Sequence, residues 1–321
     1  VGSEMCIRDR GKVLLGCLMV ICVVGIVCCS VLFIYGYSVV HGDKVFDLTE
    51  QKYSQNMTSF IYGTDKNGKT VEITRLHGEE NRIWVDMDDM SPYMPKAFVA
   101  GEDKRFYEHH GVDWVRTIGV FVKPTNFGQG GSTITQQLIK NLTDENQVTF
   151  IRKFNEILQA LNLERNYSKD EIIEAYLNTV YLSNGCYGVK TAAEKYFGKD
   201  IKDLNAAECA SLAAITKAPS TYDPLNDPKA NKKRQEYFLE AMYKEGSISK
   251  DEYESAKSYK LVFTNSKEYK GSKVKAKSTK KAQTVNSYYV DHVITSVIED
   301  LQKNGCLLYT SPSPRDRSLS R

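Results

Sequence analysis

The sequence predicts a mainly α-helical domain behind a single N-terminal transmembrane helix, with a small β-hairpin as a spacer between them. Residues 13–40 contain no charged side chain, and a bilayer core needs only about 20 apolar residues in a helix. Beyond residue 130, helix-start signals recur, each a capping residue followed three positions later by Glu or Gln. Apolar residues repeat at helical spacing between these signals.

The apolar run is interpreted as a membrane anchor. Arg8, Arg10 and Lys12 precede it, and positive residues stay on the cytoplasmic side, so residues 1–12 are predicted to be a cytoplasmic tail. A cleaved signal peptide is the alternative, but the run is too long and no small-x-small cleavage site closes it. We therefore expect residues 13–40 to span the membrane once.

The two ends of the chain differ from the rest. Residues 1–10 and 306–321 match no periodicity of their neighbours. They resemble translated sequencing-adapter read-through, so they are excluded from the fold prediction.

Residues 41–90 are predicted to form the spacer. Ser59–Tyr62 and Thr70–Ile73 flank Asn67-Gly68, the turn pair that most strongly indicates a β-hairpin. The composition becomes helical after Pro92, and we expect one domain over residues 91–260, long enough for a single core.

The helix boundaries in this domain are marked by caps and stops. Pairs with capping-box spacing, or close to it, are Thr133/Gln136, Ser168/Glu171, Asn205/Glu208 and Ser249/Glu252. Asp227-Pro228 predicts another start, and Gly198 and Gly246 predict stops. The apolar stripes are Ile151, Phe154, Leu158 and Leu161, then Ile172, Ile173, Tyr176, Leu177 and Val180.

The C-terminal part changes in composition. Residues 261–285 are rich in Lys and contain several Ser, which predicts a basic linker. Residues 286–305 read as one more amphipathic helix, the start of a further region.

The cysteines do not indicate a disulfide framework. Two cysteines, Cys186 and Cys209, lie within the domain predicted over residues 91–260. A bridge between them and two buried free thiols are both possible, and we predict the thiols.

Three segments carry the residues expected to form a site. The first contains Glu102 and Asp103; a carboxylate acting as a general base near neutral pH needs partial burial. Phe98 and Phe106 would supply that burial if the segment is helical. His109 and Arg105 are expected to orient or bind rather than catalyse.

The second segment begins a helix near Thr133. Gln136, Gln137 and Lys140 would then share a face with Thr133, and free N–H groups of the first turn favour an anion such as a diphosphate. A capped surface helix with ordinary polar residues is the alternative interpretation.

The third segment contains Arg152, Lys153 and Glu156. Arg152 and Glu156 are spaced for an ordinary surface ion pair, which contributes less than about 1 kcal/mol. The alternative is a cationic wall whose carboxylate could hold a divalent metal.

These segments resemble the peptidoglycan glycosyltransferase domain of class A penicillin-binding proteins and monofunctional transglycosylases, glycosyltransferase family 51. The motif E-D-x-x-F-x-x-H-x-G is met by Glu102, Asp103, Phe106, His109 and Gly111. G-G-S-T-x-T-Q-Q-x-x-K-N is met by Gly130–Asn141, and R-K-x-x-E by Arg152, Lys153 and Glu156. Further similarity covers Glu171–Asn178, Tyr181-Leu182, Ala207–Ser220 and Tyr222–Pro224.

The resemblance implies a lysozyme-like fold and an inverting transfer that polymerises lipid II into β-1,4-linked strands, releasing undecaprenyl diphosphate. Glu102 would be the general base, and Glu156 would assist catalysis and bind Mg²⁺ or another divalent cation. Lys140 and Arg152 would stabilise the leaving diphosphate. The expected substrate-binding residues are Asp103, Arg105, His109, Ser132, Thr133, Gln136, Gln137, Lys140, Asn141, Arg152 and Lys153.

The resemblance also implies partners and a location. The partners would be lipid II, the growing lipid-linked glycan strand, the membrane and cell-wall synthesis proteins. The protein would cross the bacterial cell membrane once, with its catalytic domain extracytoplasmic. Nucleic acid is not expected, because a net charge of +3 is too small to indicate it.

Many members of this family continue into a transpeptidase domain, so the chain is expected to be a truncated bifunctional enzyme. Ser272–Lys275 and Ser278–Lys281 fit S-x-x-K, but no K-T-G follows, and both matches are interpreted as chance.

Two other classes of function stay open. A hydrolase of finished glycan strands would need no diphosphate clamp, so Lys140, Arg152 and the anchor disfavour it. An inactive membrane-anchored scaffold is disfavoured because every catalytic position of the motifs is present.

Overall fold

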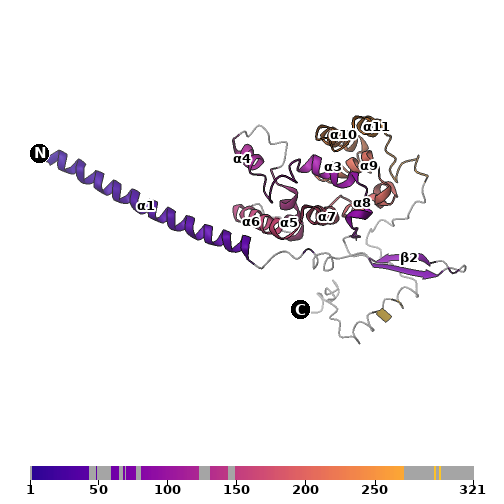
Figure 1. The fold of residues 1–321 in the computed structure, drawn as a ribbon, viewed down its shortest axis with the longest axis horizontal. Helices are drawn as coiled ribbons and strands as arrows, with labels where there is room; N and C mark the ends of the chain where they lie inside the picture. The colour runs from indigo at the N-terminus through magenta and orange to yellow at the C-terminus, as the bar shows by residue number, and fades with distance from the viewer. Residues whose placement is uncertain are drawn as a thin grey trace, which may run out of the picture. The chain divides into compact units, whose positions relative to one another are not determined.

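The structure is a computed structural model of the 321-residue chain. It describes residues 2–42, 48, 59–64, 68, 70–76, 81–122, 131–143, 149–270, 293 and 296–297 (Figure 1). The chain divides into two compact units, Val1–Met57 with Gly78–Lys273, and Thr58–His77 with Val274–Arg321.

The first unit is built almost entirely from helices, which confirms the mainly α prediction. Its described helices are α1 (Gly2–His41), η1 (Met87–Asp89), α3 (Tyr93–Glu102), α4 (Trp114–Val122), α5 (Ile134–Thr143), α6 (Phe150–Asn166), α7 (Lys169–Thr179), α8 (Val189–Phe197), η3 (Ile201–Asp203), α9 (Ala206–Ala213), α10 (Pro228–Lys244) and α11 (Lys250–Ser258). Two short strands, β3 (Asn81–Arg82) and β4 (Cys186–Tyr187), pair in parallel.

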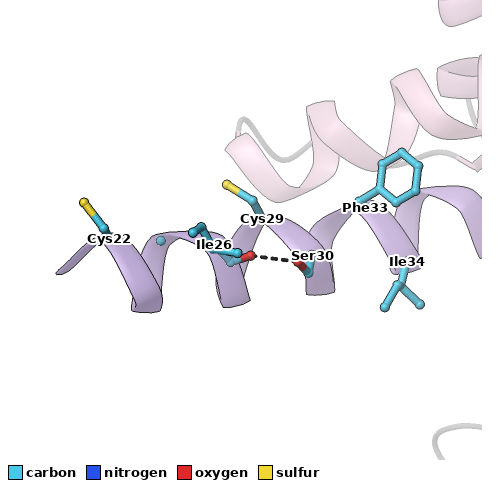
Figure 2. Close-up of a pocket in the computed structure, with 7 residues that line it drawn as sticks. Cys22, Ile26, Cys29, Ser30, Phe33 and Ile34 are labelled. Carbon is cyan, nitrogen blue, oxygen red and sulfur yellow. Dashed lines mark hydrogen bonds between the residues drawn. The ribbon is translucent and has the colours of Figure 1, made fainter. Parts of the chain in front are cut away.

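Helix α1 lies where the sequence predicted the anchor. Its stretch Leu15–His41 is long and apolar enough to cross a membrane, and none of the apolar window is buried against the protein. Figure 2 shows a shallow hollow along this helix, in which the hydroxyl of Ser30 donates to the carbonyl of Ile26 at 2.8 Å. The polar group is therefore satisfied inside the helix, as a lipid environment requires.

The C-terminal end of α1 is held by α6. The side-chain amide of Asn162 donates to the carbonyls of Val39 and Val40, each at 3.0 Å. One turn earlier, the hydroxyl of Tyr35 donates to Oδ1 of Asn155 at 3.2 Å. The last carbonyls of a helix have no partner within it, so Asn162 acts as an external cap.

Most helices of the first unit pack in two groups around the core. Helix α3 packs against α9 and α10, and α11 packs on α10, while α5 packs against α6 and α7 (Figure 1). Large side chains that are fully buried between these helices include Phe98, Phe106, Tyr176, Tyr196 and Phe238.

The predicted helix starts are confirmed by their hydrogen bonds. Ser168 with Glu171, Asn205 with Glu208, and Ser249 with Glu252 each form a complete capping box. Asp227 accepts from the backbone N–H groups of residues 229 and 230, with Pro228 in the first turn. Gly198 ends α8 in the left-handed region, and Gly246 follows α10 with a positive φ.

One predicted apolar stripe is wrong in its orientation. Ile151 and Phe154 are 76% and 39% exposed, and Leu158 alone of the first three stripe residues is buried. Helix α6 instead turns Glu156 inward, where it is 5% exposed. Helical spacing identifies an apolar stripe but does not show which face of the helix is buried. Here Glu156 can be buried because it forms ion pairs with Arg152 and Lys153.

The second unit contains the predicted hairpin. Strands β1 (Ser59–Thr64) and β2 (Thr70–Leu76) pair antiparallel, from Ser59 opposite Leu76 to Thr64 opposite Thr70. Gly68 in the connection has a φ of +79°, which suits glycine. Turn residues 65–67 and 69 lie outside the described residues.

Packing continues past residue 260, where the domain was predicted to end. Phe263 is buried, and its ring lies 5.4 Å from that of Phe197. The N–H of Thr264 donates to the carbonyl of Tyr196 at 2.9 Å. Of the predicted linker beyond residue 270 and the helix at 286–305, only residues 293 and 296–297 are described.

Cys186 and Cys209 are free and buried, as predicted. Burial raises the pKa of Cys186 and of Cys209 to about 12. Both thiols are therefore neutral and unreactive near neutral pH.

Candidate active site

Glu102 is the last residue of α3, and Asp103 is its C-cap. Phe98, one turn earlier, is fully buried. Phe106 is also fully buried, but the helix has ended before it, so it does not continue the face of Glu102. Glu102 itself is half-buried, at the boundary between core and surface.

Both carboxylate oxygens of Glu102 face hydrogen-bond donors. Oε1 accepts from the hydroxyl of Thr216 at 2.7 Å, and Oε2 accepts from the side-chain amide of Gln137 at 3.2 Å. Tyr176 donates its hydroxyl proton to Oε1 of Gln137 at 3.0 Å, which turns the amide NH₂ toward Glu102. Donors at both oxygens hold the carboxylate in one orientation.

Close packing behind Glu102 depends on a glycine. A Cβ added to Gly101 would lie 1.9 Å from the ring of Phe238 in α10. Phe238 is fully buried and cannot move aside cheaply. The missing side chain therefore lets α10 press against the turn that carries Glu102.

Asp103 connects the end of α3 to the start of α5. It is fully buried, and its Oδ2 lies 2.9 Å from Nε2 of His109 and accepts from the N–H of Ile134 at 2.9 Å. Nδ1 of His109 lies 4.0 Å from Glu164. These contacts give Asp103 and His109 structural partners inside the fold.

Arg105 forms a paired contact with Asp113, donating to Oδ2 from Nε at 3.1 Å and from Nη2 at 2.7 Å. Burial acts to raise the pKa of Asp113, but hydrogen bonds from the Arg116 N–H and from Arg105 outweigh it and lower that pKa. Arg116 also donates to the backbone carbonyl of Glu102 at 2.7 Å. The loop after Glu102 is thereby tied to α4.

Thr133 and Gln136 form the predicted reciprocal cap at the start of α5. The N–H of Thr133 donates to Oε1 of Gln136 at 2.9 Å, and the N–H of Gln136 donates to the Thr133 hydroxyl at 3.2 Å. The hydroxyl in turn donates to the carbonyl of Gly111 at 2.7 Å. Both side chains are buried, while Gln137 is half-buried and Lys140, further along the same helix, is exposed.

Gly111 is needed at this contact. Its φ is +81°, and an added Cβ would lie 2.7 Å from the carbonyl of Ala160 in α6. A side chain there would be strained and would clash with backbone.

The third segment forms a cluster of two partly exposed cations around the buried carboxylate of Glu156. Glu156 accepts from Nη1 of Arg152 at 2.8 Å and also pairs with Lys153. Lys153 donates to the hydroxyl of Ser132 at 2.8 Å, just before α5 begins. Two cations and one carboxylate give this cluster a net charge of +1.

The donor set around Glu156 does not fit a divalent cation. Each of its oxygens faces a cationic side chain, and such neighbours repel a metal ion. Among the residues that the structure describes, no three His, Cys, Asp or Glu side chains form a group able to hold a metal.

Lys140 and Asn141 lie exposed on α5. Within the described part of the chain, the ammonium of Lys140 is in no ion pair. Helix α5 thus connects two clusters: Gln137 contacts Glu102, and Ser132 before its first turn contacts Lys153.

Three further residues, which the motifs did not single out, complete the site. Thr216 lies within the stretch Ala207–Ser220 noted above, but nothing local predicts its contact with Glu102. Tyr176 was expected in an apolar stripe, and its hydroxyl adds the contact to Gln137. Asp113 carried no sequence signal.

Comparisons with known proteins agree with these motifs. A family model described as Transglycosylase matches residues 67–243, more than half of the chain. Penicillin-binding protein 1A/1B of Bacillus subtilis (strain 168) is 40% identical over 275 residues, covering 82% of this chain and 29% of that protein. Penicillin-binding protein 2D of the same organism is 48% identical over 174 residues, 53% of this chain and 25% of that protein.

The chain therefore spans less than a third of the length of these relatives. A crystal structure of Penicillin-Binding Protein 1A from Haemophilus influenzae matches 79% of this chain and 26% of that chain, with 22% identity and a TM-score of 0.38. The family match and the sequence relatives place the chain in the Transglycosylase family, as a peptidoglycan glycosyltransferase domain of class A penicillin-binding proteins.

Proposed function

We propose that the chain polymerises lipid II into β-1,4-linked glycan strands, inverting the anomeric carbon and releasing undecaprenyl diphosphate. The observation that carries this proposal is the half-buried Glu102 carboxylate, held by hydroxyl and amide donors beside a helix that also contacts the cationic cluster. A carboxylate and a cationic group are the two elements that such a transfer needs.

Glu102 acts as the general base. As it takes the proton from the acceptor 4-hydroxyl, that oxygen bonds to the anomeric carbon of the donor strand. The bond from the same carbon to the diphosphate oxygen breaks, and the diphosphate leaves with the electron pair. The proton on Glu102 is then released to solvent, which restores the carboxylate.

The cations act on the leaving group. Lys140 is exposed on α5, and Arg152 and Lys153 are held in place by Glu156. Fixed cations stabilise a leaving diphosphate because they need no rearrangement as the charge develops. Glu156 thus positions the two cations.

The remaining motif residues divide into two groups. Ser132, Gln137 and Asn141 contact the donor sugar and diphosphate. Asp103, Arg105, His109, Thr133 and Gln136 each form at least one hydrogen bond within the fold, and in this proposal they shape the site around the substrate.

Helix α1 would span the bacterial cell membrane once and leave the domain on the outer side, where lipid-linked substrates are polymerised. The exposed apolar side chains of Phe150 and Ile151 in α6 support a position against the membrane. This chain covers 29% of penicillin-binding protein 1A/1B, and we propose that the full-length protein is bifunctional and works with other cell-wall synthesis proteins.

Glu102→Gln tests the function directly, with Glu108→Gln as a matched control on an exposed carboxylate of the same segment. Fluorescent lipid II is incubated with the purified protein in detergent. We expect Glu102→Gln to lose at least about 100-fold in polymerisation while lipid II binding survives, and Glu108→Gln to stay near wild type. Equal activity of wild type and Glu102→Gln would refute the assignment, and breakdown of preformed strands would indicate a hydrolase.

A further inference from the structure

The hydroxyl of Thr216 lies between two acceptors. Its Oγ1 is 2.7 Å from Oε1 of Glu102 and 2.8 Å from the backbone carbonyl of Ala213 in the last turn of α9. A hydroxyl has one proton and two lone pairs, so it can donate to only one of these groups at a time. The direction of its hydrogen bond must therefore depend on the state of Glu102.

The carbonyl of Ala213 does not depend on this hydroxyl. It also accepts from the backbone N–H of Thr216 at 3.3 Å. While Glu102 is ionised, the Thr216 hydroxyl can donate to the carboxylate. The Ala213 carbonyl then still accepts from the Thr216 N–H. Once Glu102 is protonated, its O–H can donate to Oγ1, and the Thr216 proton turns to the carbonyl without movement of any heavy atom.

Gln137 cannot make this change. Its carbonyl oxygen receives the Tyr176 hydroxyl, so its NH₂ group faces Oε2 of Glu102 as a donor only. A proton on the Oε2 lone pair that faces this amide would meet another proton. The Oε1 side, facing Thr216, is the side of the carboxylate that can be satisfied in both states.

We propose that Thr216 is a positioning residue that stays hydrogen-bonded to Glu102 before and after proton uptake by reversing the direction of one hydrogen bond. This rests on the proposed role of Glu102 as general base. The carboxylate then keeps its position through the cycle, because no buried polar group is left without a partner at either stage.

Other charged or titratable groups near Glu102 cannot take this part. Asp103 is committed to His109 and the start of α5. Arg116 reaches the backbone carbonyl of Glu102, and Tyr176 reaches Gln137. Among the described residues, Thr216 alone donates a hydroxyl proton to the carboxylate.

The test compares Thr216→Val, which keeps the shape and loses the hydroxyl, with Thr216→Ser, which keeps the hydroxyl. Thr221→Val, on an exposed threonine of the same loop, is the control. We expect Thr216→Val to lower kcat about 10-fold, as the loss of one hydrogen bond to a charged group would, with KM for lipid II nearly unchanged. Thr216→Ser and Thr221→Val should stay within about 3-fold of wild type.

The split between kcat and KM separates this role from simple packing. A lower kcat in Thr216→Val with KM unchanged, restored by Thr216→Ser, is the result expected for a lost hydrogen bond to the base. Thr216→Ala serves as a second variant without the hydroxyl if the valine prevents folding, as judged by thermal unfolding.

Two outcomes would overturn the proposal. Wild-type kcat in both Thr216→Val and Thr216→Ala would show that the hydroxyl has no part in turnover. A loss in Thr216→Ser equal to that in Thr216→Val would show that the methyl group matters instead. If Glu102→Gln is inactive while Thr216→Val is unaffected, this inference fails alone; if Glu102→Gln is active, the proposed function fails as well.

Discussion

At the scale of single residues, the position of Glu102 depends on neighbours that do not touch substrate. Tyr176 is fully buried, and burial raises its pKa well above the ordinary value, with the charges of Glu102 and Asp103 adding to the shift. It is therefore a neutral donor at any physiological pH. Its hydroxyl decides which end of the Gln137 amide faces the carboxylate.

Tyr176→Phe tests this contact. The ring would keep its edge contact with Phe98, at 6.0 Å between centroids, while Gln137 would be free to turn its carbonyl oxygen toward Glu102. We expect kcat to fall about 10-fold and the free energy of unfolding to fall by about 1 kcal/mol. Tyr243→Phe, on a residue that is 40% exposed, is the control, and an unchanged kcat in Tyr176→Phe would contradict the assignment.

At the scale of elements, α3 presents Glu102 because both of its ends are held. Near its start, the hydroxyl of Tyr93 donates to Oε1 of Glu252 in α11 at 2.6 Å. At its end, Gly101 admits the ring of Phe238 from α10. A helix held at one end by a hydrogen bond and at the other by a buried ring has little freedom to shift the carboxylate.

The contact between α3 and α11 makes a pH-dependent contribution to stability. The hydrogen bond from Tyr93, followed by those from Ser249, lowers the pKa of Glu252 to about 2. Because the folded pKa is depressed from the ordinary value of about 4.3, the contribution is fully present above that value and is lost as pH falls toward 2.

Glu252→Gln should therefore lower Tm at pH 7, and the difference from wild type should shrink steadily as pH is lowered from about 4.5 to 2. Thermal unfolding monitored by circular dichroism measures it. Glu254→Gln, in the same helix and exposed, is the matched control. A constant difference for Glu252→Gln would show that its charge is not involved.

At the scale of the whole molecule, the anchor and the catalytic domain are connected by more than the chain. Asn162 of α6 donates to the carbonyls of Val39 and Val40 at the end of α1. Helix α6 also carries the cationic cluster. Helix α6 therefore contacts the membrane anchor and also carries residues proposed to bind the diphosphate.

Asn162→Ala should release the last turn of α1 because two carbonyls lose their donor, at a cost of about 1 kcal/mol. Hydrogen exchange in detergent should become faster for the backbone amides of residues 36–42, with the exchange of α7 unchanged. Asn166→Ala is the control, since its amide donates to the Asn162 carbonyl within α6 and not to α1. Unchanged exchange in Asn162→Ala would show that α1 is held by other contacts.

Much of this protein is determined by local sequence. The capping boxes at Ser168, Asn205 and Ser249, the hairpin around Gly68 and the apolar length of α1 follow from neighbours within a few positions. Short-range hydrogen bonds and hydrophobic spacing act without the rest of the fold. The motif residues Glu102, Lys140 and Arg152 are likewise legible because each lies in a compact pattern.

Only the tertiary structure decided how these residues meet. Glu102 and Thr216 are 114 positions apart, and Glu102 and Gln137 are 35 apart. The inward face of α6, which buries Glu156 and exposes Ile151, depends on what packs against the helix and on the pairing of its charges. The sequence by itself determines which helices form and which residues can act as base and cation; packing between distant segments decides which side chains orient the base, because such contacts leave no local periodicity.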